Sequence, residues 1–276
     1  LVKGRIAKLL KTSNMKQPSE ITVERVEKAL IVIQEQDNIG LKTVNHYSLA
    51  MKGFVNWMVP SRMPRNPLQE LELRNAETDV RHQRRALRPE EFTCLIETAR
   101  NSKRTIQHYD GETRSRIYLL SFLTGLRRAE IASLTPESFD LKAIPPTLVV
   151  EAATSKRRKK DVLPLHDVLV AMLKEWLADL APNEPLFPKL ANRRTWLMVK
   201  LDLKAAGIPY RTKDGVADFH AAGRHTYITE LLRNGTSLVE ARELARHADV
   251  KMTMNYTHIG LEDRAKAVQN LPTDPK

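Results

Sequence analysis

Apolar residues at helical spacing, followed by a cluster of prolines, determine the architecture expected for the first part of the chain. A helix is predicted over residues 23–36, with an apolar face formed by Val23, Val26, Leu30 and Ile33. A second helix is predicted over residues 43–59 by the same spacing. Prolines at positions 60, 64 and 67 end the pattern, because proline lacks the backbone donor that a helix interior needs. Residues 1–80 are therefore expected to form a compact all-helical domain.

A basic linker and a second, larger domain follow. Residues 81–88 are predicted to be the linker, and Pro89 followed by two glutamates is typical of a helix start. Two β-type runs, "TLVVEAAT" and "DVLPLH", flank the basic tip "SKRRKK" and predict a β-hairpin. The expected fold class is therefore mainly α (α+β), with a mostly helical second domain over residues 89–276 that contains a small antiparallel sheet.

The charge of the chain favours a polyanionic partner. The net charge is +12, and residues 1–88 alone contain 16 basic and 9 acidic side chains. The single cysteine, Cys94, excludes an internal disulfide and a cysteine-based metal cluster, as is usual in a reducing cytosol. No apolar run approaches the length of about 18 residues that a membrane span needs, so no membrane partner is expected. The chain opens at Leu1 and is expected to be a fragment, so a further N-terminal DNA-binding module is compatible with it.

Two arginines stand at helix boundaries that suit them to bind a phosphate. Arg127 follows a glycine in the run "TGLRRAEIASL", and Arg224 is predicted in the first turn of a helix in "FHAAGRHTYIT". A guanidinium is planar and permanently charged, so it stabilises the charge that develops on the oxygens of an attacked phosphate. The first turn of a helix adds the positive end of the helix dipole. Either arginine alone would more simply form a surface ion pair, but the two together favour phosphoryl chemistry.

A tyrosine and a basic hairpin can supply the nucleophile and the acid for cutting a phosphodiester. Tyr256 lies in the run "LARHADVKMTMNYTH", and a phenol attacks only when its proton is removed or its oxyanion is stabilised. The hairpin tip presents Lys156, with Lys159 as the competing candidate, to protonate the leaving oxygen. Taken singly, the tyrosine would be a packing residue and the basic tip a solvated loop.

Taken together and in order, these runs resemble the tyrosine recombinase (phage integrase) family over about residues 20–258. The segment "TGLRRAE" resembles the first arginine motif of the family, "TSK…VLPL" its lysine hairpin, and "RHT" its second arginine motif. The run "LARHADVKMTMNYTH" resembles its histidine-to-tyrosine helix pair. Tyr256 lies nine residues after His247, and His247 lies 23 residues after Arg224, so both spacings match the family.

One position departs from the family pattern, which is His-x-x-Arg at the second arginine. Position 221 is an alanine, and the nearest upstream histidine is His220, so the chain reads His-x-x-x-Arg with one extra residue. Gly223 would let the backbone bulge and return the imidazole to its place. The alternative is that His220 is misplaced and catalysis is weakened. His225 is expected to face a different side of the helix from Arg224 and to be structural.

The resemblance implies a site-specific DNA recombinase that needs no metal, ATP or other cofactor. Tyr256 would attack the scissile phosphate, form a 3′-phosphotyrosyl bond and free a 5′-hydroxyl. The 5′-hydroxyl of a partner strand would then attack that bond. The implied catalytic residues are Arg127, Lys156, His220, Arg224, His247 and Tyr256, with Glu130 in support of Arg127.

The resemblance also implies that the helical domain is of the core-binding (SAM-like) type and closes on duplex DNA opposite the catalytic domain. The side chains expected to contact DNA phosphates are Lys42, Lys52, Arg81, Arg84, Arg85, Arg157, Arg158 and Lys159. The tail after Tyr256 is expected either to pack on its own domain or to dock on a neighbouring protomer of a homotetramer assembled on paired recombination sites. The implied setting is cytoplasmic and nucleoid-associated, in a prokaryote, a phage or another mobile element.

Two other functions fit the same residues. A type IB topoisomerase uses nearly the same chemistry as a monomer, although the separate helical domain and the tail argue for a recombinase. A DNA-binding relative with weakened or lost catalysis is favoured by the extra residue before Arg224.

Overall fold

The computed structural model describes residues 1–155, 158–256 and 268–269. The chain divides into two compact units, Leu1–Gln83 and Arg84–Lys276, and the division falls inside the segment predicted as a basic linker. Each unit has an apolar core of its own. Within the described ranges, no helix combines the length and the apolar character that crossing a membrane requires.

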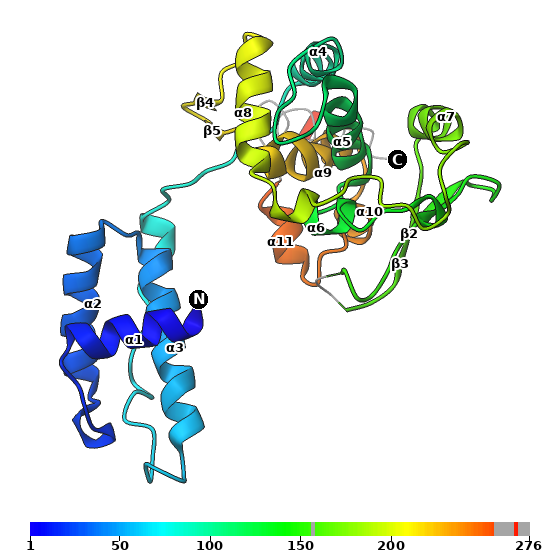
Figure 1. The fold of residues 1–276 in the computed structure, drawn as a ribbon. Coiled ribbons are helices and arrows are strands. Elements are labelled where there is room, and N and C mark those ends of the chain that lie inside the picture. Colours follow the sequence, from blue (N-terminus) through cyan, green and yellow to red (C-terminus); the bar gives the residue numbers. More distant parts are fainter. Residues whose placement is uncertain (156–157, 257–267, 270–276) are drawn as a thin grey trace, which may run out of the picture. The chain divides into compact units, whose positions relative to one another are not determined.

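Three helices form most of the first unit: α1 (Val2–Thr12), α2 (Val23–Asp37) and α3 (Leu41–Met58) (Figure 1). Thr22 begins α2 by accepting a hydrogen bond from the backbone N–H of Arg25, and Asn38 ends it in the left-handed conformation, at φ 48°. The core includes Leu9, Ile33, Met51, Val55 and Leu68. Both helices predicted from apolar spacing are confirmed by α2 and α3.

The second unit is built around α5 (Gly111–Thr124), most of which is buried. This helix packs against α4 (Pro89–Arg100), α6 (Arg128–Ile131) and α9 (Thr226–Arg233), and Figure 1 shows α4 and α9 beside it. Arg114 of α5 pairs with Asp202 of α8 (Thr195–Ala205) at 2.8 Å, and both side chains are almost fully buried. A buried charge is tolerated only when it is paired in this way, so the pair fixes α8 against α5. Further α-helices of this unit are α7 (Asp167–Trp176), α10 (Leu238–Ala245) and α11 (Val250–Met254).

A small antiparallel sheet contains the predicted hairpin. Its order is β1 (Phe139–Asp140), β2 (Thr147–Val150) and β3 (Asp161–Pro164), with Val150 opposite Asp161 at the last pair before the hairpin tip. A second pair of strands joins β4 (Arg211–Thr212) to β5 (Gly215–Val216). The predicted fold class is confirmed: the chain is mainly helical with a small antiparallel sheet. Lys156 and Arg157, at the hairpin tip, lie outside the described residues.

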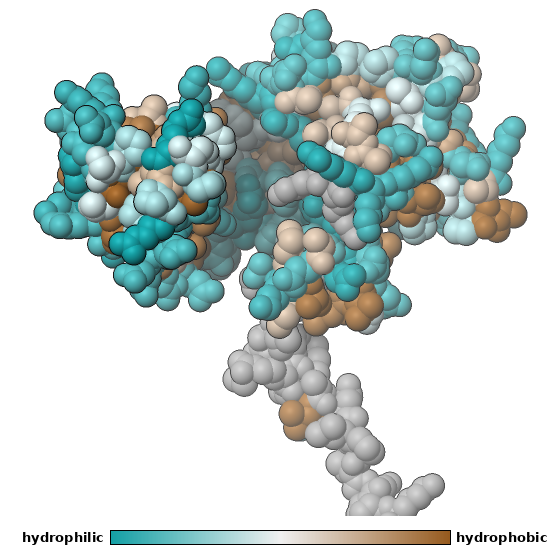
Figure 2. Space-filling view, turned by 90° about the horizontal axis from the view of Figure 1, so that it is seen from below, coloured by the Kyte–Doolittle hydropathy of each residue, from teal (hydrophilic) through white to brown (hydrophobic). Residues whose placement is uncertain are grey.

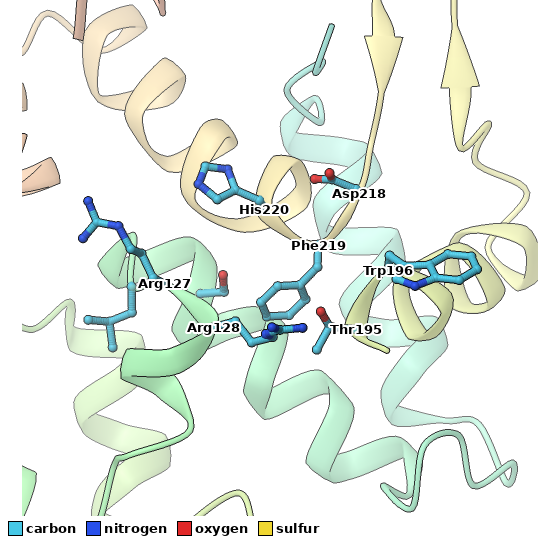
Figure 3. A pocket seen from close by; sticks show the side chains of 9 residues that line it. Arg127, Arg128, Thr195, Trp196, Asp218, Phe219 and His220 are labelled. Carbon is cyan, nitrogen blue, oxygen red and sulfur yellow. The ribbon is translucent and has the colours of Figure 1, made fainter. Parts of the chain in front are cut away.

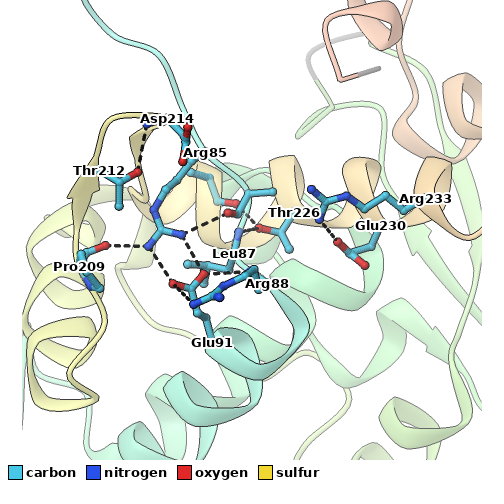
Figure 4. A network of polar contacts seen from close by, with 12 residues as sticks. Arg85, Leu87, Arg88, Glu91, Pro209, Thr212, Asp214, Thr226, Glu230 and Arg233 are labelled. Atoms are coloured by element: carbon cyan, nitrogen blue, oxygen red, sulfur yellow. Dashed lines mark hydrogen bonds and ion pairs between the residues drawn. The ribbon is translucent and has the colours of Figure 1, made fainter. Parts of the chain in front are cut away.

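Arg85 fixes the first residues of the second unit against the rest of that unit (Figure 4). Its guanidinium donates to Glu91 Oε2 at 2.8 Å and to the backbone carbonyl of Pro209 at 2.7 Å, and the residue is only 8% exposed. Two residues later, the backbone N–H of Leu87 donates to Thr226 Oγ1 at 2.9 Å. The guanidinium of Arg85 is therefore buried and bonded to groups of its own unit, an arrangement that does not favour the phosphate contact predicted for it.

Candidate active site

Arg127 is placed by a sharp turn between α5 and α6. The turn is made at Gly125, whose φ is +60°, and a side chain there would meet the ring of Tyr227 at 2.5 Å, so a glycine is needed on both grounds. Arg127 then caps α6. Its backbone N–H donates to Glu130 Oε2 at 2.7 Å, and its Nη1 donates to Glu130 Oε1 at 3.0 Å. The side chain of Arg127 keeps 23% of its surface exposed, so it is oriented from behind and still accessible to a ligand.

Glu130 is the buried acceptor that orients Arg127. It is 1% exposed, and the buried guanidinium of Arg246 donates to its Oε2 at 2.7 Å. Burial alone would raise the pKa of this carboxyl, but the hydrogen bond and charge of Arg246 and the contacts of Arg127 hold its pKa below the ordinary value. Glu130 is therefore an anion at neutral pH. This arrangement agrees with the supporting role expected for Glu130; the same expectation did not include Arg246.

The extra residue of the His-x-x-x-Arg segment is accommodated by a π-helical turn. Residues Ala221–His225 form this turn, which runs directly into α9. Its start is held by Asp218, whose Oδ1 accepts from the backbone N–H of Ala221 at 2.8 Å. A π-turn contains one more residue than an α-turn, and such single turns recur at functional sites. The bulge expected near Gly223 is thus present. The helix begins at Phe219, however, so Arg224 lies beyond its first turn, contrary to the prediction.

Arg224 is held from two sides inside the unit. It is 2% exposed, its Nη1 donates to the carbonyl of Gly125 at 2.7 Å, and its Nη2 donates to the carbonyl of Ala245. Burial and the nearby charge of Arg127 lower the pKa of Arg224 to about 10, so it remains a cation at neutral pH. The two carbonyls come from the turn after α5 and from the end of α10, so Arg224 links the first arginine motif to the segment that precedes His247.

Tyr256 lies against two histidine rings. It follows α11 in a turn closed by its backbone N–H on the carbonyl of Thr253 at 3.0 Å. Its ring centroid is 4.7 Å from that of His225 and 5.8 Å from that of His247. His247 is 2% exposed, and its Nδ1 forms a 2.9 Å hydrogen bond with the hydroxyl of Thr253. His225 was expected only to be structural; its contact with Tyr256 was missed, because a π-turn lies across this residue and changes the side to which the following positions point.

The two imidazoles and the phenol of this cluster are uncharged at neutral pH. Burial, followed by the charge of Arg84, lowers the pKa of His220 to about 4, and burial, followed by the charge of Arg224, does the same for His247. Burial raises the pKa of Tyr256, and the charges of Arg224, Arg84 and Arg127 oppose that rise. At neutral pH both imidazoles are therefore neutral, and the phenol carries its proton beside several guanidiniums.

A pocket brings the first arginine motif and His220 together, and Arg224, His247 and Tyr256 are not among its lining residues (Figure 3). It is lined by Arg127 and Arg128 from the start of α6, by Thr195 and Trp196 from α8, and by Asp218, Phe219 and His220. Arg127 and His220, which are 93 positions apart in the sequence, thus face one cavity. In the part of the chain that the structure describes, no group of three or more His, Cys, Asp or Glu side chains could hold a metal ion.

The side chains predicted to contact DNA differ in their exposure and in whether they already bond to their own unit. Lys42, Arg158 and Lys159 are exposed. The other described members bond to their own unit: Lys52 to the carbonyls of Gln69 and Leu71, Arg81 to Asp79 and Asn38, and Arg84 to Asp218. On the face drawn in Figure 2, hydrophilic residues cover most of the surface, and exposed apolar side chains form only small groups.

Comparison with known proteins identifies the class of protein that has this fold and this arrangement of side chains. The phage integrase family matches residues 85–262. The chain is similar to a tyrosine recombinase of Thermosipho africanus, with 27% identity over 93% of this chain and 87% of that one. It is also similar to the tyrosine recombinase XerC of Staphylococcus carnosus, with 26% identity over 84% of this chain and 76% of that one.

Two solved structures have the same fold. The XerH site-specific recombinase, in a post-cleavage complex with a palindromic difH substrate, has a TM-score of 0.70 and 20% identity over 97% of this chain and 79% of that one. The Tn1549 transposon integrase, in complex with a circular intermediate DNA, has a TM-score of 0.71 and 16% identity over 96% and 92%. The chain belongs to the phage integrase family. The predicted family, fold class and enzyme class, that of a site-specific tyrosine recombinase, are confirmed.

Proposed function

We propose that this chain cuts and rejoins DNA at specific sites with Tyr256 as the nucleophile. The observation that carries the proposal is the convergence of Arg127, Arg224, His247 and Tyr256, which come from separate segments of the sequence. Arg224 bonds to the segments that carry Arg127 and His247, and His247 lies 5.8 Å from Tyr256 between ring centroids. A phosphate bound by the two guanidiniums would lie within reach of the phenol.

The reaction conserves the energy of the bond that it breaks. The phenol oxygen of Tyr256 attacks the phosphorus, its proton leaves, and the bond to the 5′-oxygen breaks to give a 3′-phosphotyrosyl link and a free 5′-hydroxyl. Arg127, Arg224 and His247 bind the non-bridging oxygens, where charge develops. His220 assists the transfer of the proton. The 5′-hydroxyl of a partner strand then attacks the phosphotyrosine and releases the phenol of Tyr256, so no ATP is consumed.

The leaving 5′-oxygen requires a proton, which we assign to Lys156, with Lys159 as the alternative. Strands β2 and β3 support this assignment, because they end at the Val150–Asp161 pair and leave the basic segment as the connecting tip. Lys159 is exposed. A general acid of this kind contributes about 10²–10⁴-fold to the rate, so replacing the correct lysine separates the two candidates.

The DNA partner and the assembly follow from the same function. We propose that the helical unit Leu1–Gln83 acts as the core-binding domain and grips duplex DNA, with Lys42 among its phosphate contacts. Four copies would act on paired recombination sites, with the segment after Tyr256 docked on a neighbouring protomer. The protein would work in the cytoplasm, on the nucleoid or on a mobile element.

A suicide-substrate assay tests the proposal and finds the target sequence in the same experiment. The protein is incubated with a pool of nicked duplexes whose central positions are randomised, and the covalent adducts are recovered from a denaturing gel and sequenced. The wild-type protein is expected to form adducts that converge on one sequence. Tyr256→Phe should form none, whereas Tyr47→Phe, in the other unit, should react like the wild type. Adducts retained by Tyr256→Phe would disprove the assignment of the nucleophile.

A further inference from the structure

Arg246 is a buried arginine for which neither arginine motif accounts. It is 2% exposed and follows the last residue of α10, where its φ is +54°, in the left-handed region. Glycine adopts this conformation most readily, so the backbone alone would favour glycine at position 246. The reason for an arginine here must therefore be sought in the contacts of its side chain.

Its guanidinium lies between two elements of the catalytic unit. The Nη2 atom donates to Glu130 Oε2 at 2.7 Å, and Glu130 is the carboxylate that receives both the backbone N–H and the Nη1 of Arg127. The Nη1 atom of Arg246 lies 3.9 Å from Asp161 Oδ2, at the first residue of β3. His247 is the next residue in the chain. One side chain therefore contacts the partner of Arg127 and approaches the strand that follows the basic hairpin tip.

Within the described residues, several polar atoms of Arg246 and Asp161 lack a hydrogen-bond partner, unlike those of a fully hydrogen-bonded buried ion pair. Among the described residues, Nε and Nη1 of Arg246 and Oδ2 of Asp161 have no hydrogen-bond partner. A buried guanidinium left in this state is costly unless a partner completes it. The charged atoms of Arg246 and Asp161 face each other slightly beyond hydrogen-bond distance, so a small movement of β3 towards α10 would join them.

We propose that Arg246 is a positioning residue for the cleavage step. It holds Glu130 in the orientation that aims Arg127, and it lies beside Asp161 at the first residue of β3. The inference rests on the proposed function. Because Arg246 is covered on all sides, it acts through Glu130 and Asp161 and does not touch the substrate. Its loss should therefore slow cleavage and leave the affinity for DNA unchanged.

The pH below which cleavage is lost tests this role of Arg246, because a simple loss of packing would not shift that pH. Besides its own burial, the groups that set the pKa of Glu130 are Arg246 and Arg127, with Arg224 also close enough to interact with it. Asp161 faces Arg246 from β3. Burial raises the pKa of Glu130 and Arg246 provides the largest opposing effect, so removing Arg246 should raise that pKa. Since Glu130 must be ionised to orient Arg127, cleavage by the variant should fail at a higher pH than in the wild type.

Arg246→Gly is the most informative substitution, because glycine fits the φ of +54° and adds no backbone strain to the loss of the side chain. With saturating nicked duplex in single turnover, the adduct should form about 10- to 100-fold more slowly than in the wild type, as expected when a catalytic group is slightly misaligned. The dissociation constant for DNA should change by less than about twofold, since no phosphate contact is lost. Arg246→Lys should restore part of the rate. Arg242→Ala, on the same helix and partly exposed, is the matched control and should react like the wild type.

The double variant with Glu130→Gln tests the route of action. If Arg246 acts through Glu130, then Arg246→Gly should slow Glu130→Gln by much less than it slows the wild type. Wild-type cleavage rates and an unshifted pH profile in Arg246→Gly would overturn the inference, as would full additivity in the double variant. If Arg246→Gly does not fold, the same comparisons are made with Arg246→Lys. Failure of the wild type itself to form a Tyr256-dependent adduct would instead disprove the proposed function.

Discussion

Gly223→Ala tests whether the π-turn at the second arginine depends on close packing against α5. A methyl group at position 223 would lie 1.9 Å from Ser121 Oγ, 2.7 Å from Ser121 Cβ and 3.3 Å from the backbone carbon of Ser121. Ser121 is itself buried, at 2% exposure; its hydroxyl borders the pocket and can turn, but its Cβ cannot move without the backbone of α5. The substitution must therefore push the turn away from α5, and the turn carries Arg224.

The magnitude follows from two opposing effects. Overpacking a buried site costs about 1–3 kcal/mol. An alanine in a helix interior is favoured over glycine by about 0.5–1 kcal/mol, which offsets part of that cost. The net loss should be about 1–2 kcal/mol of unfolding free energy, or about 2–8 °C in Tm for a unit of this size. Cleavage should suffer more than stability, because an error of about 1 Å in a phosphate-binding group can cost about 100-fold in rate.

Thermal unfolding and the adduct assay measure the two effects on the same preparations. Ser121→Gly removes both side-chain atoms that cause the clash, so Gly223→Ala should cost much less stability in the Ser121→Gly background than in the wild type. A coupling of about 1 kcal/mol or more between the two positions is expected from a double-mutant cycle. A single variant Gly223→Ala with wild-type Tm and wild-type cleavage would refute the packing argument, as would purely additive effects of the two substitutions.

Three further outcomes are expected. Arg127→Ala should reduce adduct formation by at least about 10²-fold in the suicide-substrate assay and leave DNA binding largely intact, since it removes stabilisation of developing charge; complete loss of binding would mark Arg127 as structural. Because the pKa values of His220 and His247 are lowered to about 4, unfolded histidines take up protons first as the pH falls from about 6.5 towards 4, and urea unfolding should report a loss of up to about 3 kcal/mol for each of the two histidines over that window and none above it. Arg85→Ala should cost about 3 kcal/mol of stability without changing the salt dependence of DNA binding, whereas Lys42→Ala should lower that slope by about one and leave Tm unchanged.

The elements that local pattern controls were predictable from the sequence. Apolar spacing is enough to place α2 and α3, because each must bury one face, and the paired β-type runs are enough to place β2 and β3. The two arginine motifs, His247 and Tyr256 were found through their order and spacing. In the structure, Arg224 bonds to the carbonyls of Gly125 and Ala245 and so holds these distant segments together.

Long-range pairing was not predictable in the same way. Arg85 looked like its neighbours in the basic segment, yet it bonds to the carbonyl of Pro209, more than a hundred positions away. Arg246 gave no signal, because nothing local to it indicates that Glu130 will lie 2.7 Å from its guanidinium. A linear sequence shows the charge of an arginine but not whether a carboxylate has already been placed beside it, and that difference separates a core residue from a DNA contact.

The one departure from the family pattern also bears on whether the chain can catalyse. The extra residue lies between His220 and Arg224, so the 23-residue interval from Arg224 to His247 is untouched. The π-turn takes up the insertion within five residues, and the helix continues into α9 with Arg224 bonded on both sides. His220 still lines a pocket with Arg127. An insertion that displaced the site would have broken these contacts; since Arg224 keeps both carbonyl partners and His220 lines a pocket with Arg127, the geometry does not favour the loss-of-catalysis alternative.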